Sequence, residues 1–262
     1  MKSIAKQFND NTIFKRVDKD YVYLINIADA HIGSMIHNQE RLEETINLVK
    51  SRDDVFVIIG GDVTEHATTT GASSVFEESC HGIEQVYKAR DLLLPIKDKI
   101  LYIRSGNHGQ GRALRYSKIP PEQVLASLLE VPYVAGISTV IINARKNCYV
   151  ISSVHHNRKP MALEWLGSDV VYIEHTHQQN YERKLSMFMN RYTKKWVARP
   201  VYYVYAGSFL SYGGYGAERA YRITDIGCPV VELCGIQEQW GIYVYDNIEN
   251  FHRLVKNQVV AN

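Results

Sequence analysis

The sequence has little that would mark a disulfide-stabilised, membrane-spanning or strongly polyanion-binding protein. Its four cysteines are scattered without a Cys-x-x-Cys pair, which argues against a disulfide framework or a zinc knuckle and favours a reducing compartment. The N-terminus lacks the apolar core of a signal peptide, and no apolar run reaches the roughly 18 residues of a membrane span. The net charge of +2 does not require a polyanionic partner. We therefore expect a cytoplasmic protein with no membrane partner.

Internal repeats, low-complexity tracts and a convincing interdomain linker are also missing from the sequence. With 262 residues, of which 45% are hydrophobic and 22% charged, the chain has an ordinary globular composition and can bury a large core. Residues 1–20 are polar and mixed in charge, and we expect an N-terminal arm or a short edge element there. Residues 21–262 are expected to form a single domain.

Apolar runs rich in β-branched and aromatic residues alternate with helical patterns. Strands are expected at 21–28, 55–59 and 100–104 in the first half, and at 139–142, 148–154, 170–173, 200–205 and near 230 and 243 in the second. Helices are expected from Asn38 to about Lys50, from Val75 to about Leu94, and from Pro120 to about Glu130. This order predicts an α/β protein that begins with a βαβ unit.

Five of the expected strands end in side chains that can bind metal ions. These residues are Asp29 and His31, Asp62, Asn107 and His108, His155 and His156, and His175 and His177. A single histidine or aspartate at a strand end is usually a cap, a surface group or a satisfied core residue, but five such ends in one chain indicate a joint metal site. Asp62 follows a buried strand and two glycines, so we place it at the centre.

The types of ligand restrict the choice of metal. Oxygen and imidazole ligands without thiolate favour a borderline divalent ion such as Mn, Fe, Ni or Zn, and their number suggests two ions bridged by Asp62. Two ions about 3.5 to 4 Å apart would activate a bridging hydroxide to attack phosphorus and would neutralise the phosphoryl oxygens. The departing alkoxide then needs a proton, and His108 is the candidate donor.

Taken in order, these motifs resemble those of a known superfamily. Asp29-x-His31, Gly61-Asp62, Gly106-Asn107-His108, His155 and His175-x-His177 are similar to the five motifs of the calcineurin-like metallophosphoesterases. The resemblance covers residues 21 to about 210, because Ala206-Gly207-Ser208 is similar to the segment after the last motif. It implies a four-layer αββα sandwich in which two facing mixed β-sheets are flanked by helices, with a dinuclear site at the strand ends.

The resemblance also implies a role for each residue. Asp29, His31 and His177 would hold one ion, Asn107, His155 and His175 the other, and Asp62 would bridge them. His108 would act on the leaving group without binding metal directly. His155 is preferred to His156 as the ligand because it directly follows its strand. Two divalent ions are implied, with Mn the first choice.

Three positions depart from the superfamily pattern. Glu174 replaces a glycine, and it would either crowd the turn or add an acceptor behind the ligands. Gly109 replaces an acidic residue. Glu65 stands where many members have an aspartate that orients the catalytic histidine, and its longer side chain would reach the same partner. None of the three removes a ligand.

The sequence is less informative about the substrate. His108 favours phosphodiesters, whose leaving groups need a proton. Because the motifs also resemble those of the superfamily's repair exonucleases, we expect a phosphodiesterase and, within that class, a nuclease that acts on DNA. The basic and aromatic segment Arg183–Arg199 fits a nucleic-acid strand, and it equally fits an ordinary solvated hairpin or helix. The alternatives are a small-nucleotide phosphodiesterase, a phosphomonoesterase, and a non-catalytic scaffold of the same fold. A homo-oligomer or a protein partner is compatible with each.

Overall fold

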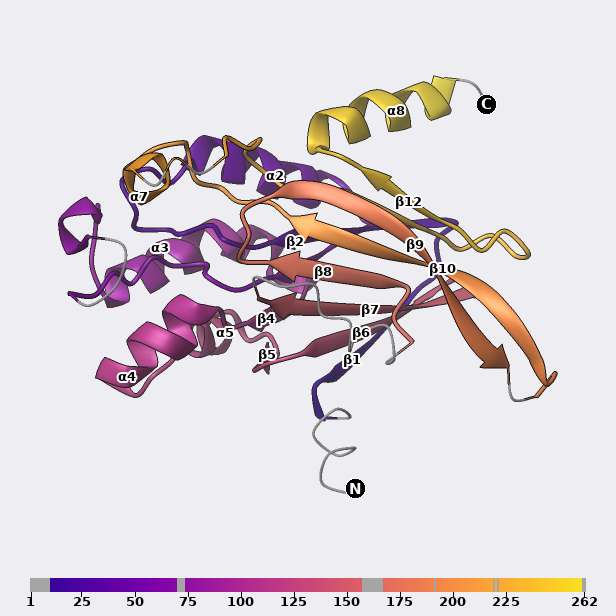
Figure 1. Cartoon of the computed structure of the whole chain (residues 1–262). Coiled ribbons are helices and arrows are strands. Elements are labelled where there is room, and N and C mark those ends of the chain that lie inside the picture. Colours follow the sequence, from indigo (N-terminus) through magenta and orange to yellow (C-terminus); the bar gives the residue numbers. More distant parts are fainter. Residues whose placement is uncertain are drawn as a thin grey trace.

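The computed structural model describes residues 10–69, 74–156, 167–190, 192–218, 220 and 222–260. Its strands form two six-stranded sheets (Figure 1). Sheet I runs through β1 (Thr12–Val17), β6 (Ser138–Ala144), β7 (Asn147–His155), β8 (Val170–Glu174), β10 (Lys195–Ala206) and β9 (Gln179–Asn190). Sheet II runs through β12 (Ile242–Tyr245), β11 (Val230–Cys234), β2 (Tyr21–Ile27), β3 (Val55–Ile59), β4 (Ile100–Arg104) and β5 (Tyr133–Val134). Both sheets mix parallel and antiparallel pairs.

The alternation of side chains along each strand builds two apolar layers. Leu24 and Ile58 of sheet II pack with Tyr172 of sheet I in one buried cluster, so the two sheets face each other. The neighbouring residues Ile25 and Ile59 point the other way, into a second cluster with helices. Those helices are α2 (Gln39–Ser51), α3 (Ile83–Leu93), α5 (Pro121–Leu129) and α8 (Ile248–Val260). The predicted α/β class, with two facing mixed sheets flanked by helices, is confirmed.

The expected helix from Val75 to Leu94 is wrong in its first half. A short 3-10 turn, η1 (Val75–Glu77), is followed by extended backbone, and α3 begins only after Gly82. The backbone of this segment pairs with another loop instead, because Met35 donates to the carbonyl of Glu77 and Ser79 donates to that of Gly33. At its other end α3 continues as the 3-10 helix η2 (Leu94–Lys99).

The cap of α2 matches the sequence pattern, whereas several short helices do not. Asn38 caps α2 as expected, since its side chain accepts a hydrogen bond of 2.9 Å from the backbone N–H of Arg41. After His108 the chain forms the π-helix η3 (His108–Ala113) and then α4 (Leu114–Ser117), where a loop was expected. Further short or terminal elements are α7 (Gly214–Glu218) and α8, neither of which the sequence pattern indicated.

The sheets bring the five predicted strand ends to one side of the molecule. β2, β3 and β4 are parallel neighbours in sheet II, while β7 and β8 are parallel neighbours in sheet I. The loops after these strands therefore meet at the same end of the two sheets. Residues 12–17, within the segment expected to be an arm or an edge element, form the edge strand β1 of sheet I. No helix of the described residues is long and apolar enough to cross a membrane.

Candidate metal centre

The structure brings all seven predicted ligands together. His155 Nε2 lies 3.0 Å from Asp62 Oδ2 and 3.0 Å from Asn107 Oδ1. His177 Nε2 lies 3.4 Å from both Asp29 Oδ1 and His31 Nε2. The ring of His175 packs edge-on against that of His155. Residues separated by as many as 148 positions thus converge on one small volume.

The spacing of the side-chain atoms that meet there matches the spacing of ligands around a metal ion. Three overlapping groups each have their ligand atoms within 4.8 Å of one another: Asp29 with His31 and His177, His31 with Asp62 and His108, and Asp62 with His155 and His175. Ligands at about 2.1 Å from an ion lie roughly 3.0 to 3.4 Å apart in octahedral or tetrahedral geometry, close to the spacings seen here. The buried Asp29 Oδ1 accepts no hydrogen bond. The donor set therefore fits divalent metal.

The backbone at the site is unusually strained. Five of the seven predicted ligands have positive φ angles, although none is glycine: Asp29 (49°), His31 (49°), Asp62 (56°), His175 (74°) and His177 (55°). Each such residue costs of the order of 1 to 3 kcal/mol and persists only where its surroundings enforce it. The left-handed backbone turns each side chain inward directly after its strand.

Hydrogen bonds between the loops hold these conformations. Asp62 Oδ1 accepts from the backbone N–H of His108 at 2.8 Å, and Asp29 Oδ2 accepts from the N–H of His175 at 2.9 Å. The hydroxyl of Ser208 donates to the carbonyl of Asp29 at 2.9 Å, which ties the segment after β10 to the first strand end. One oxygen of each carboxylate is thereby fixed, and the other faces the centre.

Two glycines are needed because side chains of the site occupy their Cβ positions. A Cβ at Gly61 would lie 2.8 Å from Cγ of His155 and closer still to its Nδ1. A Cβ at Gly106 would lie 2.6 Å from Cγ of Asp62 and closer to Oδ1. The glycines thus admit ligand side chains to the backbone of the neighbouring loop.

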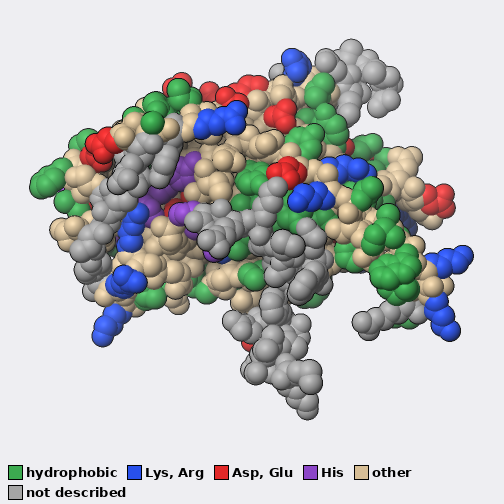
Figure 2. Space-filling view, in the orientation of Figure 1, with side chains coloured by type: hydrophobic (Ala, Val, Ile, Leu, Met, Phe, Trp, Pro, Cys, Tyr) green, Lys and Arg blue, Asp and Glu red, His purple; other side chains and the backbone are tan. Residues whose placement is uncertain are grey.

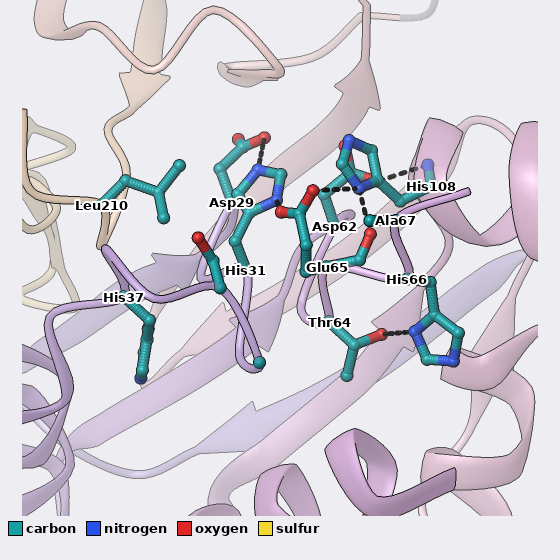
Figure 3. Close-up of polar contacts among 12 residues, drawn as sticks. Asp29, His31, His37, Asp62, Thr64, Glu65, His66, Ala67, His108 and Leu210 are labelled. Carbon is teal, nitrogen blue, oxygen red and sulfur yellow. Dashed lines mark hydrogen bonds and ion pairs between the residues drawn. The ribbon is translucent and has the colours of Figure 1, made fainter. Parts of the chain in front are cut away.

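Glu65 contacts two histidines, but not in the way the sequence suggested (Figure 3). Its carboxylate lies 2.6 Å from His31 Nδ1, so it orients a predicted ligand. The atom nearest His108 is instead the backbone carbonyl of Glu65, which accepts from His108 Nδ1, while the carboxylate is 3.7 Å away. The longer side chain thus reaches His108 only at 3.7 Å, while its closest contact is with His31 and its backbone carbonyl accepts the hydrogen bond of His108.

His108 sits beside the centre as a neutral imidazole. The shortest contact of Nδ1 is with the carbonyl of Glu65, which can only accept, so Nδ1 carries the hydrogen even though the donor Arg112 Nη1 is also 3.2 Å from it. Nε2 then faces Asp62, whose Oδ2 is 3.8 Å away. Burial lowers the pKa of His108 to about 4, and the nearby charges of His31 and Arg112 add to the lowering, which Asp62 and Glu65 only partly oppose. The ring is thus oriented by the main chain and faces the reactive volume with one free nitrogen.

Glu174, which the sequence analysis expected to crowd the turn or to add an acceptor, is an acceptor behind the predicted ligand His155. It accepts 2.9 Å hydrogen bonds from Asn26 Nδ2 and the N–H of Gly61, and it pairs with Arg104 at 2.7 Å. Burial alone would raise its pKa, but the charge of Arg104 and the contact with His155 outweigh burial and hold the pKa at about 2. Its carboxylate, 3.4 Å from His155 Nδ1, supports that ring from behind.

The two innermost ligands depend on each other electrostatically. Burial would raise the pKa of Asp62, but His155 and His108 hold it well below the usual range. Conversely, burial would lower the pKa of His155, but Asp62 and Asp29 raise it well above 6.5. The centre therefore concentrates negative charge that a cation, or a proton on His155, must balance. The neighbouring His156 is exposed and lies outside this group.

Glu122 is a buried acid at the site that the sequence did not reveal. It lies near the start of α5, is 1% exposed, and neither of its oxygens has a hydrogen-bond partner of ordinary geometry. Burial and then the charge of Asp62 raise its pKa to about 8. A Cβ at Gly109 would lie 2.5 Å from its Cδ, so its carboxyl fills the space beneath the loop at Gly109. A glutamate in the first turn of a helix gave no signal in the sequence, because acids are common there.

Comparison with known proteins adds little to this geometry. No protein-family model matches the chain, and no curated protein matches its sequence. Among solved structures, the chain is similar to a conserved uncharacterized protein from Streptococcus pneumoniae TIGR4, described as a predicted phosphoesterase. That match covers 86% of this chain and 98% of the other, with 12% identity and a TM-score of 0.39. A likeness of this degree does not extend to function.

Proposed function

We propose that this protein is a cytoplasmic phosphodiesterase that uses two divalent metal ions, with Mn²⁺ the first candidate, and that nucleic acid is its substrate. The observation that supports this most is the pair of adjacent ligand sets, one around Asp29 and the other around Asp62. Hydrolysis of phosphate esters by two neighbouring ions requires such an arrangement. The four free cysteines fit a reducing compartment.

The chain would bind the ions through side chains that its own hydrogen bonds already orient. When bound, the ions would lower the pKa of a water between them and offset charge on the phosphoryl group. Asp62 would be shared by the ions, while Glu65 and Glu174 would support His31 and His155 from behind. Because imidazole binds metal in its neutral form, metal binding would compete with the proton on His155.

His108 is placed to move a proton. Its Nδ1–H is fixed on the carbonyl of Glu65, so only Nε2 can exchange a proton with groups at the centre. A neutral ring can take a proton at Nε2 and return it to the departing alkoxide. Alkoxides of phosphodiesters need that proton, which favours diesters over activated monoesters.

Hydrolysis of bis(p-nitrophenyl) phosphate and p-nitrophenyl phosphate, with and without Mn²⁺, tests the proposal. Metal-dependent cleavage of the diester, lost in Asp62→Asn and retained in the exposed-histidine control His252→Ala, would support it. Preference for the monoester would make the protein a phosphomonoesterase. Metal content measured on the same samples decides the remaining alternative, since a folded protein that binds fewer than one ion per chain and cleaves neither substrate would be a scaffold.

A further inference from the structure

The hairpin of β9 and β10 connects the metal centre to a distant surface. Each strand has 12 residues, and the two pair antiparallel along their whole length. β9 begins two residues after His177, and β10 ends two residues before Ser208, which hydrogen bonds to Asp29. At about 3.4 Å per residue the far turn lies roughly 40 Å along the hairpin from its base. Figure 1 shows its far end extending beyond the other strands.

One face of the far half is apolar and exposed. The cross-strand pairs on this face are Met189 with Trp196, Met187 with Ala198, and Leu185 with Pro200. Nearer the base of the hairpin, the same face is buried, and its Val204 packs in the core between the two sheets. The exposed fractions are 63% for Leu185, 59% for Met187, 45% for Met189 and 63% for Trp196. We call these four residues the apolar strip. A continuous strip of this kind is unusual on a surface that has no binding role.

The same hairpin is strongly basic. Residues 179–206 contain six lysines and arginines and one acid, Glu182, although the net charge of the whole chain is only +2. Arg199 pairs with Asp169, and Lys184 lies over the ring of Tyr203. Lys194 and Lys195 stand at the exposed turn beside Tyr192, which is 98% exposed, and Arg183 lies on β9. Arg191 lies outside the described residues. Figure 2 shows basic and hydrophobic side chains side by side at this end of the molecule.

We propose that this hairpin binds single-stranded nucleic acid and leads it to the metal centre, an inference that rests on the proposed phosphodiesterase function. The cations would neutralise backbone phosphates, and Trp196 and Tyr192 would stack on unpaired bases. A duplex keeps the faces of its bases covered and leaves the apolar strip unused. A second copy of the chain would bring two hairpins of like charge together, which opposes association. Because this face is covered by the core near the base, the strand would follow the open edge of β9, which begins two residues after His177, to reach the centre.

Binding is measured by fluorescence anisotropy with labelled 30-nucleotide oligo(dT), oligo(rU) and a blunt DNA duplex of equal length. The full chain carries His108→Ala, and Mn²⁺ is present, so that the probes survive. We expect tighter binding of single strands than of the duplex. Lys194→Glu with Lys195→Glu should weaken single-strand binding at least tenfold and make the slope of log K against log salt shallower by about 1.4. Trp196→Ala should weaken it about tenfold. The controls Lys50→Glu with Lys88→Glu, and Tyr87→Ala, change exposed residues on α2 and α3, the helices packed on sheet II, and should have little effect.

Failure of this inference and failure of the proposed function give different results. The hairpin variants, made in the chain with His108 intact, should hydrolyse bis(p-nitrophenyl) phosphate at the wild-type rate, because that substrate is too small to reach the strip. If the wild type cleaves this diester but binds no single strand, or if the hairpin variants bind as well as the wild type, the inference is overturned alone. Two other results would also overturn it, each in a protein that binds no single strand. Light scattering that shows a doubled molecular mass, lost in Trp196→Ala, would mean that the strip binds a second copy of the chain. Binding to anionic vesicles that is lost in Trp196→Ala would mean that the strip binds a membrane surface. Loss of hydrolysis of every substrate by the wild type counts against the proposed function.

Discussion

Gly109 and Glu122 occupy one space, so a side chain added at one should be tolerated only when the other is shortened. In Gly109→Ala the new Cβ would lie 2.5 Å from Cδ and 2.6 Å from Oε1 of Glu122, and closer still to Oε2. Glu122 is 1% exposed and has little room in which to retreat. The φ angle of Gly109 is not positive, so alanine itself fits the backbone. The steric conflict should therefore account for the whole effect.

The expected size follows from known cases of overpacking. Forcing atoms into a filled interior costs about 1 to 3 kcal/mol, and we expect Gly109→Ala to lie at the upper end because the opposing group is a carboxyl. Gly111→Ala is a matched control in the same π-helix, since a Cβ there meets nothing within 4 Å. That change should be neutral or should stabilise by up to about 1 kcal/mol, because alanine restricts the unfolded chain.

Urea unfolding of Gly109→Ala, Glu122→Ala and the double variant gives the coupling directly. Glu122→Ala relieves the clash, so the double variant should be more stable than the sum of the single effects predicts, by about 2 kcal/mol. All three proteins are measured with metal chelated, so that differences in ion binding do not enter. Additive effects within about 0.5 kcal/mol, or a Gly109→Ala protein as stable as Gly111→Ala, would refute the claim that Glu122 fills the space beneath the loop.

Three further changes test the electrostatics of the centre. His108→Ala should lower kcat by about 10² to 10⁴ for a diester with an alkoxide leaving group, such as a DNA strand, while Mn²⁺ content by mass spectrometry stays at the wild-type level, and loss of metal instead would make His108 a ligand. Glu174→Gln should cost about 3 kcal/mol in urea unfolding because Arg104 stays buried without its partner, and a cost below 1 kcal/mol would contradict the buried pair. Glu122→Gln should become increasingly more stable than the wild type as pH rises from about 4.5 to about 8 in chelator. Across that window the folded wild type keeps the proton that the unfolded chain releases, so wild-type stability falls by up to about 1.4 kcal/mol per pH unit and levels off above pH 8. A difference that does not vary with pH would mean that Glu122 is ionised in the folded state.

The strand ends could be predicted because a local pattern determines them. β3 matches its expected bounds of Val55 and Ile59, and β2 ends at Ile27, one residue before its expected end. Once the strands are parallel, their carboxyl ends must lie at one edge, so polar residues after them had to meet. The residues that gather at the centre could thus be predicted from the sequence, and the structure shows that they lie close together.

What the sequence missed depends on partners far along the chain. The segment after Val75 looked helical, but its backbone pairs with residues 33–35 and its acid, Glu78, turns inward to accept from Ala67 and Gln85. Glu122 gave no signal, because only the folded loop shows that it fills the space at Gly109. Glu65 was linked to His108, but the loop places its carboxylate on His31 and its carbonyl on His108. Pairings of this kind are set by tertiary packing, which no local pattern records.

The strained backbone determines which substitutions report on chemistry alone. Asp62 has φ of 56°, and its Oδ1 accepts the N–H of His108 at 2.8 Å, so the side chain both tolerates and stabilises this conformation. Asparagine also adopts left-handed backbone readily and keeps an acceptor oxygen, whereas alanine loses both. Asp62→Ala would therefore release the loop that carries Asn107 and His108, and lost activity would not separate a missing ligand from a displaced one. Asp62→Asn removes the charge and leaves the loop in place. For that reason its metal content and its unfolding free energy, measured together, distinguish a ligand from a structural residue.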